Sequence, residues 1–204
     1  RSTPSNSSAA SDVYKRQVTV FEALSFTGGV PKSVIPEYRL PKEIVDRDVN
    51  FILKSGIEIK ENTKIGKELT IDKLKEQGYN AIFIAVGAPF SRKINIPGVE
   101  LNGVEWGVDF LRDVKEGKKV EIKDRVVVIG GGNVAVDVAI TAHKLGAKEV
   151  EMVCLEKMEE MPAHSWEIEE AIKEGVLINP SWGPNKIIGE EGHVSGIEFI
   201  RCVA

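Results

Sequence analysis

A run of apolar, β-branched residues at 126–129 leads directly into three glycines, and a segment with helical spacing of apolar residues follows them. The run suits a strand that is buried on both faces of a parallel sheet. Gly130, Gly132 and Ala135 match the G-x-G-x-x-A fingerprint, in which the first glycine permits a tight turn and the second lets the backbone approach a pyrophosphate. The small third residue lets the helix pack on the strand. A helix that starts near Asn133 would present free N–H groups and a positive dipole end to phosphates. The pattern therefore predicts a dinucleotide site, the alternative being a purely structural strand–turn–helix.

The composition limits the kind of protein that this chain can be. It has 204 residues, a net charge of −4, 42% hydrophobic residues and 28% charged residues, as is ordinary for a soluble protein with one large or two small α/β domains. The slightly negative net charge does not favour binding to nucleic acid, and no apolar stretch approaches the length of a bilayer span. We therefore expect a cytoplasmic protein with no nucleic-acid partner and no membrane insertion.

Cysteine and histidine usage argues against several redox and metal chemistries. Cys154 and Cys202 lie far apart and form no C-x-x-C pair, which disfavours a disulfide framework, a dithiol centre or an iron–sulfur cluster held by this chain. The three histidines have no metal-ligand spacing among themselves or with the cysteines. We expect no metal site, and we expect Cys154 to be a small core residue because it falls within a predicted strand.

Apolar periodicity predicts alternating strands and helices on both sides of the glycine turn. Residues 1–17 are rich in Ser, Thr, Asn and Ala, and we expect a disordered or non-native leader there. The expected strands are 18–22, 57–59, 81–86 and 149–155 with short segments near 176–178, 186–188 and 194–200, and the expected helices are 42–55, 71–77, 104–114 and 166–173. Residues 35–41, with two prolines, predict an ordered loop. The order indicates an α/β protein with small β additions.

Two acidic residues end predicted strands, where a ribose would be bound in a dinucleotide fold. Glu156 follows the strand after the fingerprint helix, at a spacing that suits a hydrogen bond to an adenosine ribose. The alternative is a solvated surface glutamate. Glu22 also ends a strand, and Gly87 ends a later one where the backbone could approach a cofactor. No glycine fingerprint precedes Glu22, so by itself it is more typical of an ordinary strand-end acid.

Several short motifs occur in order along the chain. They are Phe21-Glu22-Ala23, Gly28-Gly29, Ile35-Pro36-Glu37-Tyr38-Arg39-Leu40-Pro41, Ala85-Val86-Gly87, Ile96-Pro97-Gly98 and the run from Gly130 to Asp137. This series resembles the small (beta) subunit of glutamate synthase and its relatives, among them the N-terminal flavin module of dihydropyrimidine dehydrogenase. The resemblance covers 18–202, and the Ile-Pro-x-aromatic-Arg-Leu-Pro element is its most specific part.

The resemblance implies two nested dinucleotide-binding (Rossmann-like) folds. An NAD(P)-binding domain at 123–204, truncated at its C-terminal end, would be inserted in a truncated FAD-binding domain, of which 18–122 form a part. Hydride would pass from the nicotinamide to FAD. Electrons would leave through iron–sulfur clusters in domains outside this chain, or in an iron–sulfur or large catalytic partner subunit. No acid–base residue is expected to be catalytic, because the protein need only align the two rings and exclude water.

Matching positions in the family suggest which residues bind each nucleotide. On the flavin side, the resemblance implies that Glu22 meets the adenosine ribose, that Gly28, Gly29, Val30 and Arg39 lie along the nucleotide, and that Gly87 closes over it. On the pyridine nucleotide side, Gly131, Gly132, Asn133 and Val134 would cradle the phosphates, between Gly130 and Ala135 of the fingerprint. Without the resemblance, the sequence favours a surface arginine between prolines at position 39.

Departures from the family pattern predict the choice of pyridine nucleotide. NADPH-using members place arginines just after the second strand of the inserted domain and after a following Pro-Ala, where guanidinium groups can pair with a 2′-phosphate. This chain has Leu155, Glu156 and His164 there. A carboxylate would repel the phosphate but accept hydrogen bonds from a free ribose, so we expect NADH to be preferred over NADPH. The charge of Lys157 could still reach a phosphate.

The chain also lacks the first FAD fingerprint, the cysteine-rich cluster domain and the closing FAD segment of the family. We expect this stretch alone to bind FAD poorly and to associate, because a sheet without its central strand exposes unpaired edges. Two other functions remain open. One is a pyridine nucleotide:disulfide reductase, which the missing C-x-x-C disfavours. The other is a module that binds NAD(H) without turnover.

Overall fold

The computed structural model describes residues 16–202, which form two compact units. Unit 1 contains the described residues up to 32 together with 40–87, and unit 2 contains 33–39 together with 88–202. The leader predicted at 1–17 lies almost entirely outside the described residues.

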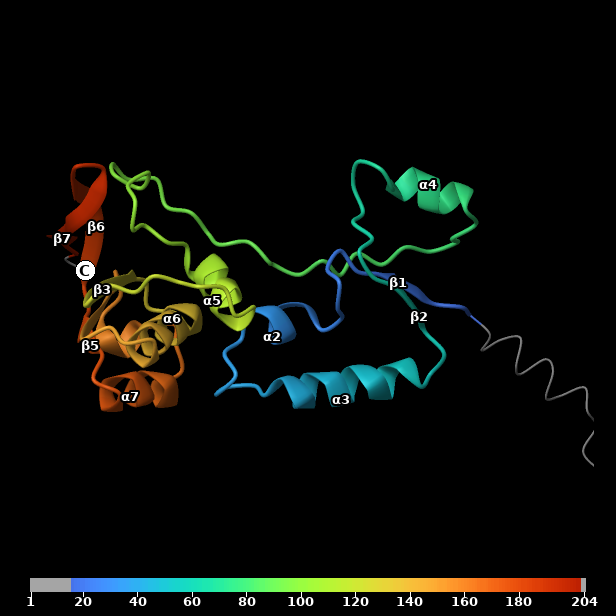
Figure 1. The fold of residues 1–204 in the computed structure, drawn as a ribbon, viewed down its shortest axis with the longest axis horizontal. Coiled ribbons are helices and arrows are strands. Elements are labelled where there is room, and N and C mark those ends of the chain that lie inside the picture. The colour runs from blue at the N-terminus through green and yellow to red at the C-terminus, as the bar shows by residue number, and fades with distance from the viewer. Residues whose placement is uncertain (1–15, 203–204) are drawn as a thin grey trace, which may run out of the picture. The chain divides into compact units, whose positions relative to one another are not determined.

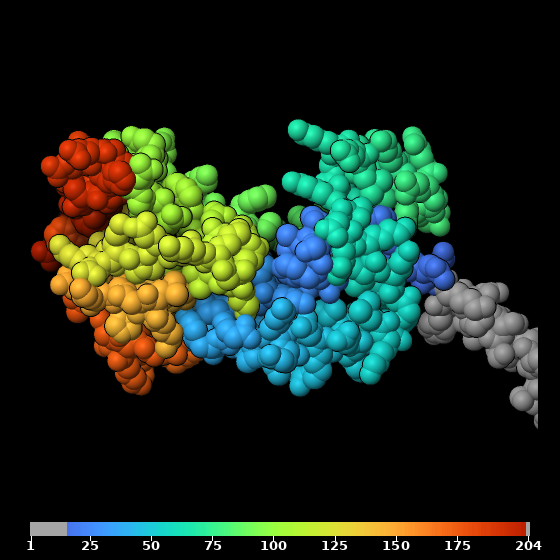
Figure 2. Space-filling model, in the orientation of Figure 1, coloured from blue at the N-terminus to red at the C-terminus, as the bar shows by residue number. Residues whose placement is uncertain are grey.

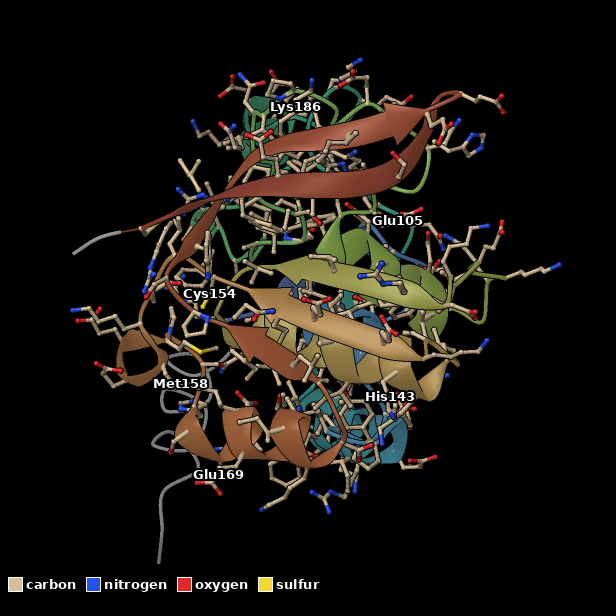
Figure 3. All side chains as sticks on the ribbon, turned by 90° about the vertical axis from the view of Figure 1, so that its left-hand side faces the viewer. Glu105, His143, Cys154, Met158, Glu169 and Lys186 are labelled. Carbon is tan, nitrogen blue, oxygen red and sulfur yellow. The ribbon has the colours of Figure 1, made fainter. Side chains whose placement is uncertain are left out.

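A parallel three-stranded sheet forms the centre of unit 2. Its order is β3 (Arg125–Ile129), β4 (Glu149–Val153) and β5 (Leu177–Asn179), and the crossover helices are α6 (Asn133–Lys144) and α7 (Ser165–Lys173) (Figures 1 and 3). The register pairs Ile129 with Val153, so β3 and β4 end at the same edge. The strand–helix alternation confirms the predicted α/β class with a Rossmann-like parallel sheet.

Helix α6 provides much of the core of unit 2. Val136, Ala139 and Ile140 have no exposed surface, and they share the core with Val150 and Met152 of β4. Apolar residues at these spacings give α6 one face that packs against the sheet. Gly146 follows the end of the helix in the left-handed region (φ +109°), where glycine is favoured.

An antiparallel hairpin, β6 (Trp182–Glu190) and β7 (His193–Arg201), packs on the loop at 96–103, and helix α5 (Gly107–Lys115) follows that loop. The N–H of Ile187 donates to the oxygen of Pro97 (2.8 Å), and the N–H of Val194 donates to the oxygen of Asn102 (2.9 Å). A Cβ at Gly98 (φ +91°) would lie 2.3 Å from the oxygen of Ile187, so no larger residue fits there. Figure 2 shows the hairpin (red) and α7 (orange) at the surface of unit 2.

Unit 1 contains a parallel pair of short strands with three helices. They are β1 (Thr19–Phe21) and β2 (Glu58–Lys60), with α2 (Gly29–Ser33), α3 (Lys42–Leu53) and α4 (Ile71–Glu76). Helix α4 is capped by the hydroxyl of Thr70, which accepts from the N–H of Lys73 (3.2 Å). The bounds of β1, β2, α3 and α4 lie within two residues of those predicted, whereas α2 was not predicted.

The strand predicted at 81–86 is wrong, because these residues form no strand in the structure. Their apolar side chains are exposed, including Phe83 (92%) and Val86 (78%). A strand needs partners for its backbone N–H and C=O groups. In the described part of unit 1 the one sheet is the β1–β2 pair, and 81–86 does not join it. An apolar run alone could not reveal this.

Truncating the α6 core should destabilise unit 2 selectively. We expect Ile140→Ala to lower the free energy of unfolding by about 2–5 kcal/mol, because the side chain is fully buried and would leave a cavity. Urea unfolding followed by tryptophan fluorescence measures this, since Trp106, Trp166 and Trp182 all lie in unit 2. The control Ile172→Ala removes a side chain that is 51% exposed and should cost less than about 1 kcal/mol. Equal losses in both variants would contradict this account of the core.

The thiol of Cys154 should react slowly, because this residue is buried in the core as the sequence predicted. It lies just after β4 with 2% of its surface exposed, and burial, with a smaller effect of the Glu156 charge, raises the pKa of its thiol. Since the thiolate is the reactive form, we expect Cys154 to be modified far more slowly than the half-buried Cys202 in the folded protein. Timed alkylation with mass spectrometry measures both rates. Faster labelling of Cys154 than of Cys202 would refute this.

Candidate nucleotide-binding site

The glycine turn between β3 and α6 has the shape that a diphosphate requires. Gly130 has φ +134°, in the region that favours glycine, and a Cβ there would touch the Cβ of Ala135 at 3.5 Å. The turn and the first turn of the helix thus lie close together. Gly132 precedes α6, and a Cβ built on it would have nothing within 4 Å. The backbone of the turn is therefore open to a ligand at Gly132.

The N-terminus of α6 gives this opening a positive electrostatic character. The N–H groups of Asn133 and Val134, which begin the helix, have no acceptors within it, whereas the N–H of Ala135 donates to the oxygen of Gly132 (2.9 Å). The first turn contains no acidic residue, so nothing there opposes the dipole of a 12-residue helix. A diphosphate would therefore be bound by backbone groups.

Glu156 reaches the turn from the end of β4. Its Oε2 lies 3.0 Å from the position of a Cβ on Gly131, and the Cβ of Cys154 lies 3.1 Å from the same point. A side chain at Gly131 would therefore require small shifts of Glu156 and of Cys154, which lies just after β4. The oxygen of Glu156 accepts from the N–H of Ser181 (2.8 Å), which fixes its backbone. The carboxylate of Glu156 therefore lies beside the glycine turn, at the end of β4.

The segment that follows Glu156 is attached to the turn by two hydrogen bonds. The N–H of Ala163 donates to the oxygen of Gly131 (3.0 Å), and the N–H of His164 donates to Oδ1 of Asn133 (3.2 Å). The ring of His164 stacks on that of Trp166 with centroids 6.1 Å apart. Sequence reasoning identified Asn133 as a helix start but missed its side-chain bond, which no local pattern encodes.

Arg39 lies in unit 2, on the segment 33–39. Its guanidinium forms ion pairs with Asp137 of α6 and Glu170 of α7. With 11% of its side chain exposed, it is not the surface arginine that the sequence alone favoured. Its contact with a flavin nucleotide stays a prediction. The sequence analysis missed the ionic roles of Asp137 and Glu170.

The other flavin candidates lie in unit 1. Glu22 follows β1, and its Oε1 accepts from the N–H of Leu24 (2.8 Å). Gly28 has φ +116°, and a Cβ there would come within 2.9 Å of Lys32 and Val45, so only glycine fits. Gly29 and Val30 begin α2. Gly87 (φ +66°) is the last residue of unit 1, and a Cβ built on it would have nothing within 4 Å.

Glu22 and the 28–30 segment thus share one connection after β1, whereas Gly87 is far along the chain. An acid and a glycine pair after a strand fit the adenosine side of a flavin nucleotide. The described part of unit 1 contains no strand–glycine–helix turn like that at Gly130.

Residues 16–202 contain no cluster of His, Cys, Asp and Glu that could hold a metal ion. No helix in the same range combines the length and apolar character needed to cross a bilayer.

Two curated relatives are similar over most of the chain. The beta subunit of NADP(+)-dependent formate dehydrogenase from Moorella thermoacetica is 37% identical over 97% of this chain. The PreT subunit of NAD-dependent dihydropyrimidine dehydrogenase from Escherichia coli O157:H7 is 35% identical over 85%. The chain spans 29% and 42% of the lengths of these relatives.

Solved structures and a family model agree on the fold. The NADPH complex of FprA from Mycobacterium tuberculosis superposes with a TM-score of 0.70 and 19% identity, covering 95% of this chain and 64% of that one. The model for pyridine nucleotide-disulphide oxidoreductases matches residues 6–200. The chain therefore belongs to the pyridine nucleotide-disulphide oxidoreductase family, whose members use FAD together with NAD(P)H.

Proposed function

We propose that this chain belongs to a flavin oxidoreductase subunit that takes hydride from a pyridine nucleotide and sends electrons to iron–sulfur clusters or a partner subunit. The proposed NAD(P)-binding domain is 123–204, and 18–122 are the proposed part of an FAD-binding domain into which it is inserted. The compact unit 2 begins earlier, at 88, and includes α5. The motif resemblance supports a glutamate synthase beta-like subunit, and both relatives are named as subunits.

The observation that carries this proposal is the carboxylate of Glu156 beside Gly131, at the edge of an open glycine turn. We propose that Gly130, Gly131, Gly132, Asn133, Val134 and Ala135 form the pyridine nucleotide cradle. Backbone N–H groups would bind the diphosphate, and Glu156 would accept hydrogen bonds from the adenosine ribose.

The flavin side of the proposal rests on Glu22, Gly28, Gly29, Val30 and Gly87, which would hold FAD together with protein outside these residues. Bound FAD would supply the hydride acceptor. The residues of this chain would then bind and orient the two nucleotides and exclude water from them.

We further propose that NADH is preferred over NADPH. A 2′-phosphate would approach the carboxylate of Glu156, and like charges at close range repel. Lys157 lies next in the chain, but its Nζ is 3.9 Å from Oε1 of Glu160, so this carboxylate partly compensates its charge. The names of the relatives include both an NADP-dependent and an NAD-dependent enzyme, so family membership alone does not decide between the nucleotides.

Neutralising Glu156 tests this preference directly. In the full-length protein, Glu156→Gln should weaken NADH binding by about tenfold through loss of a charge-assisted hydrogen bond. It should also tighten NADPH binding, because a repulsive charge is removed. Titrations of both nucleotides, followed by quenching of tryptophan fluorescence, give the two dissociation constants. The control Glu159→Gln neutralises an exposed acid nearby and should change neither. Tighter binding of NADPH than of NADH by the wild type would contradict the preference.

Hydride transfer is tested by stopped-flow mixing of NADH with the flavin-loaded, full-length protein. We expect the flavin absorbance to bleach in a phase that saturates with NADH, because the nicotinamide would be held against the flavin. Binding of NADH without bleaching would instead support a module that binds NAD(H) without turnover.

A further inference from the structure

The guanidinium of Arg39 joins the two helices that flank the nucleotide site. Its Nε lies 2.6 Å from Oδ1 of Asp137 on α6, and its Nη1 lies 2.5 Å from Oε2 of Glu170 on α7. Glu167, also on α7, brings Oε1 within 3.9 Å of Nε. One side chain from a distant segment therefore bridges α6 and α7, which also pack against each other.

This bridge is enclosed by the protein. The guanidinium lies 5.4 Å from the ring centroid of Tyr38 and 5.2 Å from that of Trp166. The side chains of Asp137 and Glu167 are 13% and 7% exposed. Buried ion pairs are screened little by solvent, so removing one partner leaves an uncompensated charge. The pair with Asp137 is thus a buried constraint on the segment and α6, whereas the pair with Glu170 reaches a side chain of α7 that is 39% exposed.

Both helices lead from the bridge to the glycine turn. Asp137 lies one turn beyond Asn133, whose first-turn N–H groups face the proposed diphosphate. Glu167 and Glu170 lie in the first two turns of α7, and His164 just before that helix is bonded to Asn133. A shift of α7 relative to α6 would therefore move the 161–164 segment across the site.

The charges around Arg39 affect the same site. Asp137, Glu167 and Glu170 surround one guanidinium, and burial is the main cause that raises the pKa of Asp137. Without Arg39, the carboxylate of Asp137 would keep the hydroxyl of Tyr38 (3.5 Å) but lose its cation, one turn from a site proposed to attract a diphosphate. Arg39 therefore serves the anion site by its charge as well as by its geometry.

We propose that Arg39 is a positioning residue for the pyridine nucleotide, holding the N-terminal ends of α6 and α7 in register through Asp137 and Glu170. This inference rests on the proposed nucleotide site. It assigns to the guanidinium a task in the NAD(P)-binding unit, whereas the family resemblance implies a flavin contact.

The test uses the full-length, FAD-containing protein with Arg39→Met, Arg39→Lys, Glu170→Gln and the control Arg47→Met, whose exposed guanidinium pairs with Asp48 on the same helix. The readouts are the dissociation constants for NADH and NADPH, the flavin content, and KM and kcat of NADH-dependent dye reduction. We expect Arg39→Met to raise the dissociation constant of the preferred nucleotide by about tenfold, at unchanged flavin content. KM should rise with little change in kcat, and Arg47→Met should match the wild type.

The lysine variant should be intermediate, because an ammonium group retains the charge but lacks the fork that reaches both carboxylates. Wild-type affinity in Arg39→Met, or loss of flavin at unchanged nucleotide affinity, would overturn the inference. If Arg39→Met fails to fold, Glu170→Gln decides, since it removes one arm of the bridge at a side chain that is 39% exposed. Weaker nucleotide binding there supports the bridge, and unchanged binding overturns it. A wild-type protein that binds neither nucleotide would instead refute the proposed function.

Discussion

The parallel register of β3 with β4 determines where the groups of the nucleotide site lie. Because Ile129 pairs with Val153, the turn after β3 and the acid after β4 leave the sheet at one edge. Gly131 then faces Cys154 and Glu156 so closely that a Cβ on it would lie 3.0 Å from Oε2 of Glu156. A slip of one residue would turn every side chain of a strand to the opposite face and separate these groups. The buried residues of α6 and β4 fix the register and thereby the site.

Sequence reasoning succeeded where structure is encoded locally. The glycine turn and the start of α6 at Asn133 depend on neighbouring residues, so the local sequence pattern predicted both. It failed at 81–86, where an apolar run could not show whether a partner strand was present. It also missed the ionic bridge of Arg39, because Asp137 and Glu170 become its neighbours only through tertiary packing. The Ile-Pro-x-Tyr-Arg-Leu-Pro motif marked the arginine as special without indicating its partners.

The relatives show that one scaffold accommodates different nucleotides. One is named for NADP(+) and the other for NAD, although each is more than a third identical to this chain. The two nucleotides differ by a single phosphate on the adenosine ribose. Discrimination can therefore reside in the few side chains just after β4, while the glycine turn and helix dipole serve both. In this chain the residues at the positions that we propose for this choice are Glu156, Lys157 and His164.

The wide sequence separation within the Arg39 bridge has a consequence for the order of folding. Arg39 is synthesised 98 residues before Asp137 and 131 residues before Glu170. The β3–α6–β4–α7–β5 stretch, by contrast, is contiguous and can collapse through short-range crossovers. Contacts that close long loops form late, because their entropy cost is met only after local structure exists. During synthesis, segment 33–39 can therefore pack against α6 and α7 only after both helices have been made.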